Sequence, residues 1–257
     1  MSLSLARRAP ARARRVAVLT WAACIALLAL AKALAAVEPT GLLAGNLAGV
    51  AAILFVFLPE RRIEAAGEVG GWSPYGLPWG GLTPSERLRR WGRGGLVALS
   101  ACGLVFPLFL AGFWAYGRLL PSLPPGLASV LAPYAVPPSP HLRLPPRLGV
   151  LALVQLFVVA LPEELFYRGW FQTTWAATAP GRGVQVLGAR LGSGFFVTQA
   201  LFAVGHLVVL EPWRLATFFP GLLFGWLRER TGDLAAPVFF HALSNLFIAT
   251  LEASFYG

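Results

Sequence analysis

Two adjacent carboxylates, Glu163 and Glu164, occur where the sequence is otherwise almost free of acids. The chain holds 11 Asp and Glu residues, none of them lies between Arg87 and Pro162, and the pair directly follows the apolar run VQLFVVALP. A charged side chain at the centre of a membrane helix costs about 2.5 to 3.5 kcal/mol on translocon-based scales. Carboxylates at that depth need partners or a water-filled cavity, which favours a functional role. Alternatively, Pro162 and the two acids form the first turn of an interfacial helix, a position that suits both residue types.

Helical spacing gives the two carboxylates different surroundings. Glu164 and Arg168 are four residues apart, so on a helix they face each other and can form an ion pair. Glu163 projects about 100° away and does not share this partner. We therefore expect Glu164 and Arg168 to brace the helix, and Glu163 to be available as a general base.

Two of the three histidines also lie inside apolar segments. His206 follows Phe202 by one helical turn in GFFVTQALFAVGHLVVL, and His241 precedes Asn245 by one turn in APVFFHALSN. A single intramembrane histidine is more often a packed, hydrogen-bonded residue than a catalyst. Two histidines, an asparagine and a carboxylate pair on separate predicted helices instead indicate a polar pocket that a helix bundle assembles.

The elements that must position these residues are membrane helices. The chain has 257 residues, of which 57% are hydrophobic and only 12% are charged, whereas a soluble domain is about 25% charged. The mean hydropathy is +0.67. These values exclude a disordered chain, most soluble folds and, despite the net charge of +10, a nucleic-acid-binding module. They predict an all-α, polytopic membrane bundle of about seven to eight helices. The apolar segments are about 16–37, 41–58, 95–117, 191–210, 213–228 and 234–255, with a further one from about 148.

The arginines orient the bundle. Residues 1–15 hold five arginines and the connection 59–94 holds six, and the positive-inside rule places both in the cytoplasm. Continued alternation places 118–147 outside, 178–190 inside and the C-terminus outside. We therefore predict a multi-pass protein of the cell inner membrane with a cytoplasmic N-terminus, which contacts the lipid bilayer and no nucleic acid. The first segment also reads as a signal peptide ending at Ala33-Leu34-Ala35, but further spans follow at once, which favours a retained helix.

Two connections have unusual compositions. In 59–94, the stretch SERLRRWGRGG is rich in arginine and is predicted to lie along the anionic membrane surface. Residues 121–147 contain nine prolines, which argues against a helix there and predicts an extended external loop. The two cysteines, Cys24 and Cys102, both lie in apolar segments, so neither a disulfide framework nor a cysteine-based metal site is expected.

The polar residues of the second half resemble the motifs of a known family. Three patterns occur in order on successive hydrophobic segments: Glu163-Glu164-x-x-x-Arg168, Phe202-x-x-x-His206 and His241-x-x-x-Asn245. Together they resemble the three motifs of the CAAX-protease and bacteriocin-processing (CPBP, or Abi) intramembrane proteases. The chain is thus similar to type II CAAX prenyl endopeptidases, and a bacterial sorting protease of the myxosortase type is one expected subtype. The resemblance covers roughly 148–250. It implies a CPBP-like catalytic membrane domain (148–257). The arginine and hydropathy patterns predict an Arg-rich cytoplasmic N-terminus (1–15) and N-terminal membrane helices and loops (16–147) before it.

The resemblance implies an intramembrane endopeptidase that hydrolyses a peptide bond in or near the bilayer, in a membrane-anchored protein or peptide. Glu163 would activate the attacking water and His206 would help to hold it. His241 and Asn245 would stabilise the oxyanion, while the ion pair of the first motif would brace the helix. These roles are physically reasonable, because a carboxylate in an apolar bundle is a stronger base and side-chain donors in a water-poor site stabilise an oxyanion strongly.

The cofactor and an alternative function stay open. Such families have been described as metalloproteases, and Glu163, His206 and His241 could hold a divalent metal such as zinc, with water as the fourth ligand. A glutamate-and-water mechanism with Asn245 as an oxyanion donor needs no metal, and the sequence has no HExxH pair, which favours an enzyme without a cofactor. The same buried residues could serve a transporter or channel as a proton or ion path, although we find no repeated halves of the kind that transporters often show.

A buried site also constrains the substrate. A helical amide is hydrogen-bonded and shielded, so a substrate that arrives within the bilayer as a helix must unwind before it is cut. We therefore expect an apolar, membrane-inserted segment rather than a soluble peptide. The Arg- and Ala-rich chain is typical of bacteria, which disfavours prenylated substrates. A sorting protease that removes a C-terminal membrane helix from surface proteins fits this expectation.

Overall fold

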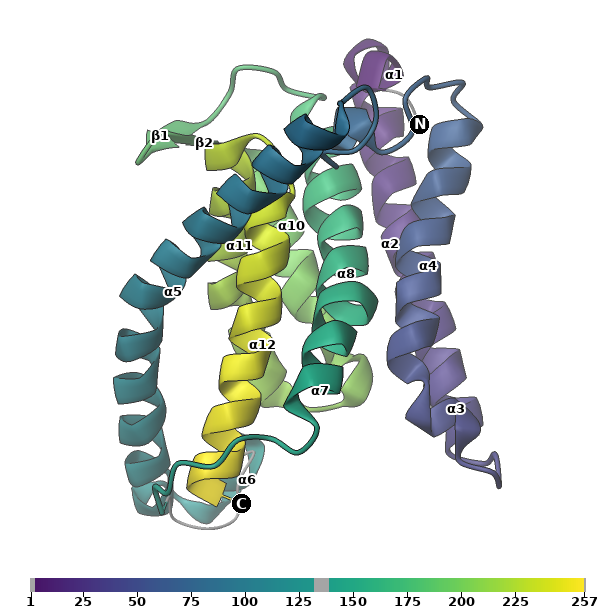
Figure 1. The fold of residues 1–257 in the computed structure, drawn as a ribbon. Helices are drawn as coiled ribbons and strands as arrows, with labels where there is room; N and C mark the ends of the chain where they lie inside the picture. The colour runs from purple at the N-terminus through teal and green to yellow at the C-terminus, as the bar shows by residue number, and fades with distance from the viewer. Residues whose placement is uncertain (1–2, 132–138, 257) are drawn as a thin grey trace.

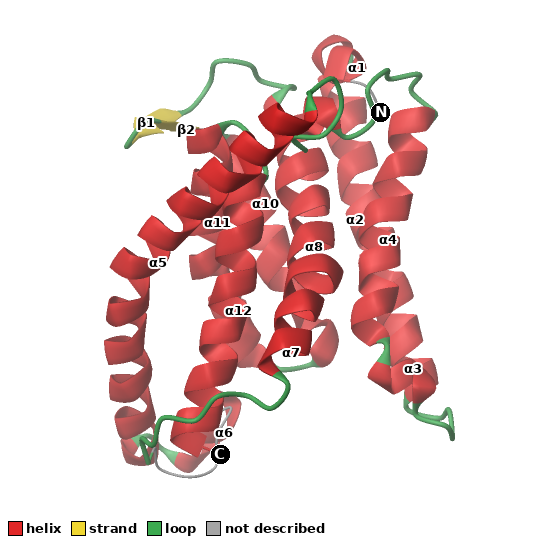
Figure 2. Cartoon of the chain, in the orientation of Figure 1, coloured by secondary structure: helices red, strands yellow, loops and turns green. Residues whose placement is uncertain are grey.

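Residues 3–131 and 139–256 are described in the computed structural model of the chain, and helices dominate them (Figure 2). The first half contains α1 (Leu3–Arg8), α2 (Pro10–Ala35), α3 (Leu42–Gly45), α4 (Leu47–Glu64), the 3₁₀ turn η1 (Ser73–Tyr75), α5 (Pro84–Leu119), the 3₁₀ turn η2 (Leu120–Ser122) and α6 (Pro125–Leu131). One long helical stretch follows, built from α7 (Leu148–Val154), π-helical η3 (Gln155–Ala160), α8 (Leu161–Glu164), π-helical η4 (Leu165–Gln172) and α9 (Thr173–Ala176). The remaining elements are β1 (Val184–Val186), β2 (Ala189–Leu191), α10 (Ser193–Gly205), the 3₁₀ turns η5 (His206–Val209) and η6 (Pro212–Thr217), α11 (Phe218–Thr231) and α12 (Ala235–Tyr256).

The prediction of an all-α membrane bundle is confirmed, with fewer full-length spans than the apolar segments suggest. Among the described residues, four helical stretches are long and apolar enough to cross a membrane: Pro10–Ala35, Pro84–Ser122, Leu148–Ala176 and Ala235–Tyr256. The other predicted segments form helices that fall short of this. The last turns of α4 carry Glu60, Arg61, Arg62 and Glu64. Helices α10 and α11 have 13 and 14 residues, which is about 20 Å against a hydrocarbon core of about 30 Å.

Helix α5 begins well before the predicted segment 95–117. The arginine-rich stretch that we expected along the membrane surface forms its first turns, and its position at the surface stays a prediction. Thr83 and Glu86 form a capping box in which each side chain bonds the backbone N–H of the other, and Pro84 occupies the first helical turn. These are strong helix-start signals. They place the start in a polar segment that hydropathy alone leaves outside the span.

Two connections also differ from expectation. The proline-rich connection contains a short helix, Pro125–Leu131, because a proline is tolerated in the first turn, where its missing N–H has no helical partner anyway; residues 132–138 lie outside the described part of the chain. The connection 178–190 folds into an antiparallel hairpin in which Val184 pairs with Leu191 and Val186 with Ala189, an element that the sequence analysis did not predict.

The connections gather at two ends of the bundle, in the alternation that the arginine pattern predicts (Figure 1). We call one the arginine-rich end, which holds 15 of the chain's 20 arginines: 1–15, 59–94, 177–192 and 228–234. We call the other the arginine-poor end: 36–46, 120–131, 139–147, 206–217 and the last turn of α12. Contacts within each end agree with this grouping, since Nε of Arg14 donates to Oγ1 of Thr178 at 2.8 Å and Nζ of Lys32 donates to the carbonyl oxygen of Val208 at 3.3 Å. Which end faces the cytoplasm stays a prediction.

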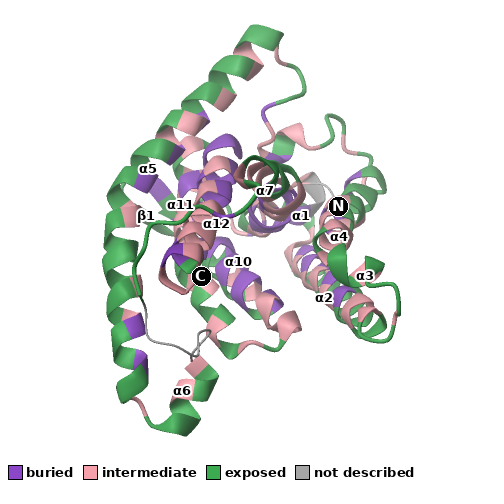
Figure 3. Cartoon of the chain, turned by 60° about the horizontal axis from the view of Figure 1, so that its bottom comes forward, coloured by how far each residue is buried: buried purple, intermediate pink, exposed green. Residues whose placement is uncertain are grey.

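The central element of the bundle is η4. All eight of its residues are buried, as expected of a helix that is surrounded by other helices on every side. Its aromatic residues pack into one core with residues of α10, α11 and α12: Phe166, Tyr167, Trp170, Phe171, Phe202, Phe224 and Phe240. Buried residues accordingly gather in the middle of the bundle, while α5 exposes most of its outer face (Figure 3). The polar residues of the first motif therefore sit in the most enclosed part of the molecule.

Candidate active site

Glu163 and Glu164 lie near the middle of one continuous helical stretch, Leu148–Ala176. Its α-helical hydrogen bonding is interrupted twice, because π-helical η3 directly precedes α8, which holds both acids, and π-helical η4 directly follows it. Pro162 supplies a local cause, since proline has no N–H to donate and its ring clashes with the carbonyl group four residues earlier. π-helical turns are rare and frequently occur at functional sites.

The expected ion pair between Glu164 and Arg168 forms and is completely buried. Nη1 of Arg168 donates to Oε1 of Glu164 at 2.9 Å, and both side chains are 0% exposed. Nη2 donates to Oε1 of Gln199 at 2.7 Å and to the carbonyl oxygen of Gly221 at 3.2 Å. The guanidinium carbon also lies 4.2 Å from the ring centroid of Phe202. Arg168 therefore links η4 to α10 and α11 and fixes the orientation of the Glu164 carboxylate.

Two glutamines extend this network to the arginine-rich end. Nε2 of Gln199 donates to Oε1 of Gln172 at 3.0 Å, and Nε2 of Gln172 donates to Oε1 of Glu229 at 2.7 Å. The sequence analysis missed both glutamines. Their signal is a polar amide inside an otherwise apolar run, in GFFVTQALF and LFYRGWFQ. A buried amide without partners is costly, so its presence indicates a hydrogen-bonded network.

His241 connects the two carboxylates. Its Nδ1 lies 2.9 Å from Oε1 of Glu164, and its Nε2 lies 3.9 Å from Oε2 of Glu163. An ionised carboxylate only accepts hydrogen bonds, so Nδ1 carries a proton and donates it to Glu164. The ring stacks on Phe224, with centroids 4.5 Å apart. This geometry leaves Nε2 of His241 facing Glu163, an arrangement that the sequence analysis did not foresee.

Glu163 is the less enclosed of the two acids. Its side chain is 17% exposed, but Oε2 itself is buried and has no hydrogen-bond partner among the described residues. The two adjacent carboxylates thus differ as predicted: Glu164 is held by an arginine and a histidine, and Glu163 is not. An unpaired carboxylate oxygen beside an imidazole is an arrangement suited to proton transfer.

His206 lies where α10 ends. Its backbone N–H bonds the carbonyl oxygens of Ala203 and Val204, and its Nδ1 donates to the carbonyl oxygen of Phe202 at 2.8 Å. In the neutral ring, Nε2 is then the acceptor. A helix end at membrane depth is tolerated where it is buried in protein or lines a cavity, and the ring of His206 occupies such a position.

Asn245 is positioned by a residue that the sequence analysis missed. Its Nδ2 donates to Oε1 of Gln155 at 2.8 Å. Gln155 begins η3, and its signal in the sequence is again an amide in an apolar run, LGVLALVQLFVVAL. An asparagine amide has two N–H donors, so the second one stays available to a ligand.

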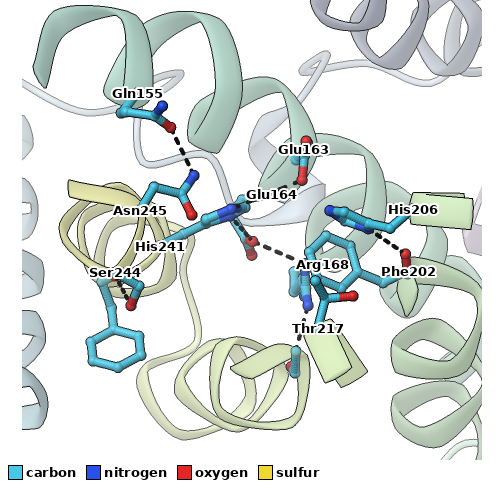
Figure 4. A network of polar contacts seen from close by, with 12 residues as sticks. Gln155, Glu163, Glu164, Arg168, Phe202, His206, Thr217, His241, Ser244 and Asn245 are labelled. Atoms are coloured by element: carbon cyan, nitrogen blue, oxygen red, sulfur yellow. Dashed lines mark hydrogen bonds and ion pairs between the residues drawn. The ribbon is translucent and has the colours of Figure 1, made fainter. Parts of the chain in front are cut away.

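Residues of the second and third motifs line one cavity of about 390 Å³ between α5, α10, α11 and α12. Its lining residues are Val105, Phe106, Phe109, Phe202, His206, Ala216, Thr217, Phe219, Pro220, Leu223, Phe224, Phe240, His241, Ser244, Asn245, Phe247 and Ile248. Glu163 is not one of them, but in Figure 4 its carboxylate lies between the rings of His206 and His241. The structure therefore brings His206, His241 and Asn245 to one cavity, with Glu163 next to His241.

Glu163, His206 and His241 are the residues that could hold a divalent metal. In the described part of the chain, no group of three His, Cys, Asp or Glu side chains is placed to hold a metal ion. The Nδ1 atoms of both histidines are engaged, that of His241 with Glu164 and that of His206 with a carbonyl oxygen. Histidines that bind a metal through Nε2 commonly make the same Nδ1 contacts. We derive no step that uses a metal. Metal dependence itself stays a prediction.

Comparison with known proteins agrees with the motifs. A family model described as type II CAAX prenyl endopeptidase Rce1-like matches residues 145–247. This range contains all three motifs and Gln155. No curated protein and no solved structure gives a significant match to the chain.

Proposed function

We propose, from the premise that this membrane protein belongs to the CPBP family of intramembrane CAAX proteases, that it hydrolyses a peptide bond by means of a water molecule activated by Glu163. One observation carries the proposal. The buried, unpartnered Oε2 of Glu163 lies 3.9 Å from Nε2 of His241, beside a cavity that His206, His241 and Asn245 line. No observation favours the alternative of a transporter or channel.

Glu163 is placed to take a proton from water. A separation of 3.9 Å between Oε2 of Glu163 and Nε2 of His241 is too long for a direct hydrogen bond and is compatible with one water molecule between the groups. The Nε2 acceptor of neutral His206 would orient that water. As the water oxygen bonds to the substrate carbonyl carbon, its proton passes to Glu163. A positioned base of this kind contributes typically about 10²- to 10⁴-fold to the rate.

Asn245 and His241 would stabilise the resulting oxyanion. The second N–H of the Asn245 amide is a donor without further change. Because Nδ1 of His241 already donates to Glu164, Nε2 can donate only from the doubly protonated ring. That ring would balance the charge of the site, where two carboxylates otherwise face the single guanidinium of Arg168. When the carbon–nitrogen bond breaks, Glu163 returns the proton to the leaving nitrogen, and no further reactant is needed.

The mechanism is tested by Glu163→Gln. This variant keeps the size and shape of the side chain and removes the base. We expect cleavage to fall by about 10²-fold or more, while the protein still accumulates in the membrane. Glu60→Gln is the matched control, since Glu60 is exposed on α4 and its replacement should leave cleavage unchanged. Full activity of Glu163→Gln would refute the glutamate mechanism.

The substrate that we propose is a protein or peptide anchored in the inner membrane by an apolar segment. The support is the apolar lining of the cavity that contains His206, His241 and Asn245. Removal of a C-terminal membrane helix from surface proteins, as in the sorting subtype, is one reaction of this class. A comparison of the membrane proteomes of a deletion strain and the wild type tests it, because the substrate should keep an additional terminal segment in the deletion strain.

A further inference from the structure

The cavity has a polar and an apolar part. Its polar side chains are His206, His241, Asn245, Ser244 and Thr217, and no Asp, Glu, Lys or Arg is among its described lining residues. The rest of the wall is built from aromatic and aliphatic side chains of α5, α11 and α12. An occupant must therefore present a polar peptide group to the histidines and uncharged, apolar groups to the remaining wall.

The cavity extends from the middle of the bundle to the arginine-poor end. Helix α12 lines it with its central part, from Phe240 to Ile248, and α11 lines it with its first turns, from Phe219 to Phe224. Ala216 and Thr217 belong to η6, which is part of the arginine-poor end. None of the described residues at the arginine-rich end contributes to the wall.

The cavity also reaches the side of the bundle that faces lipid. Phe219 on α11 is 70% exposed and Phe109 on α5 is 39% exposed, and both line the cavity. Helix α5 contains Pro107 between its lining residues Phe106 and Phe109. A proline inside a helix bends it and removes a hydrogen bond, and Figure 1 shows α5 curving along the outside of the bundle. The wall of the cavity thus includes an exposed ring from each of α5 and α11.

From these observations we infer that the apolar segment of the substrate enters sideways from the bilayer, between α5 and α11, in the half of the membrane at the arginine-poor end. The positive-inside rule places that half away from the cytoplasm. The inference rests on the proposed function and narrows its substrate class. The enzyme acts on anchored proteins whose cleaved bond reaches it from the outer half of the bilayer, and a soluble cytoplasmic peptide has no route to the histidines.

The side of access is tested by cysteine labelling, which does not depend on activity. In a background with Cys24→Ala and Cys102→Ala, Thr217→Cys reports on the cavity wall and Arg89→Cys on the arginine-rich end. A membrane-impermeant maleimide should label Thr217→Cys in intact spheroplasts and Arg89→Cys only in inverted vesicles. The reverse pattern, or labelling of both positions from the same side, would overturn the inference while leaving the catalytic proposal intact.

The lateral route is tested by two neighbouring substitutions on α5. Val105 lines the cavity, whereas Leu104 is 72% exposed and is not part of its wall. The probe is a fluorogenic peptide with one apolar segment of about 20 residues, reconstituted with the enzyme in liposomes. Val105→Trp should raise KM at least tenfold, and Leu104→Trp should change it less than twofold. Lateral entry would be refuted by an unchanged KM for Val105→Trp or by equal effects of both substitutions on KM. It would also be refuted if the wild type cleaved the same peptide equally well without its apolar segment. Failure of the wild type to cleave either peptide would instead count against the proposed function.

Discussion

Replacement of Arg168 by methionine should destabilise the protein far more than an equivalent change at the surface. The guanidinium bonds three acceptors on three helical elements, Glu164, Gln199 and the carbonyl group of Gly221. Methionine fills much of the same volume without any donor. The substitution therefore leaves a fully buried carboxylate with only its histidine partner, and it leaves Oε1 of Gln199 without its donor.

The magnitude follows from this loss of partners. Breaking a buried ion pair by removing one member costs about 3–5 kcal/mol, and each buried acceptor left unsatisfied adds about 1–3 kcal/mol. The first figure alone is a large fraction of a typical folding free energy of about 5–15 kcal/mol. It corresponds to a fall in melting temperature of about 6 to 20 °C, at about 2–4 °C per kcal/mol for a domain of this size.

The pair Arg61 and Glu64 provides the matched control. It has the same charges at a distance of 3.0 Å, but its side chains are 65% and 57% exposed, and such surface pairs contribute about 0–1 kcal/mol. Thermal unfolding in detergent should separate Arg168→Met from Arg61→Met clearly. The double variant Glu164→Met, Arg168→Met should lose less than the sum of its single variants, because no unpaired charge remains. Equal, small shifts for Arg168→Met and Arg61→Met would refute the argument.

Three further predictions address positioning, packing and the cofactor. Gln155→Leu removes the acceptor that orients Asn245. We therefore expect kcat to fall about 5- to 150-fold with little change in KM, and Gln155→Glu to restore kcat. An equally large rise in KM would contradict an orienting role. A Cβ at Gly94 would lie 2.4 Å from Cβ of Ala235, whereas one at Gly92 would meet nothing within 4 Å. Gly94→Ala should therefore lower the free energy of unfolding by about 1–3 kcal/mol, and Gly92→Ala should raise it by up to about 1 kcal/mol. Equal melting temperatures for the two variants would be inconsistent with close packing of α5 on α12. Strong chelation should leave the purified enzyme active and without stoichiometric zinc, whereas a loss that one divalent metal restores would support the metal alternative.

The parts of the fold and site that the sequence predicts are those that local patterns encode. The length of each apolar run predicts the long helices, and the spacing of four residues predicts the ion pair between Glu164 and Arg168. Capping chemistry around Thr83 marks the true start of α5, but the predicted segment rested on hydropathy alone. Similarly, a high proline content suggested an extended chain throughout 121–147, although a proline in the first turn allowed the short helix Pro125–Leu131.

The contacts that define the site join residues far apart in the chain. His241 and Glu164 are 77 positions apart, and Asn245 and Gln155 are 90 apart. No local periodicity encodes such pairs; the order of the motifs predicted that their helices meet, but not which atoms bond. The π-helical segments were also beyond local reasoning, because Pro162 explains a disturbed hydrogen-bonding pattern without fixing how far it extends.

The network behind Glu164 explains how two adjacent carboxylates can differ at membrane depth. Gln199 and Gln172 are neutral amides, so they hold Arg168 through hydrogen bonds without bringing another ion into the core, which would carry its own desolvation cost. The charge near the cavity is then set by Arg168, the two glutamates and His241 alone. The guanidinium is committed to Glu164 at 2.9 Å, and the ring of His241 lies 3.9 Å from Oε2 of Glu163. In the mechanism that we propose, the buried pair of Glu164 and Arg168 would keep the imidazole of His241 in place while Glu163 takes the proton of the attacking water.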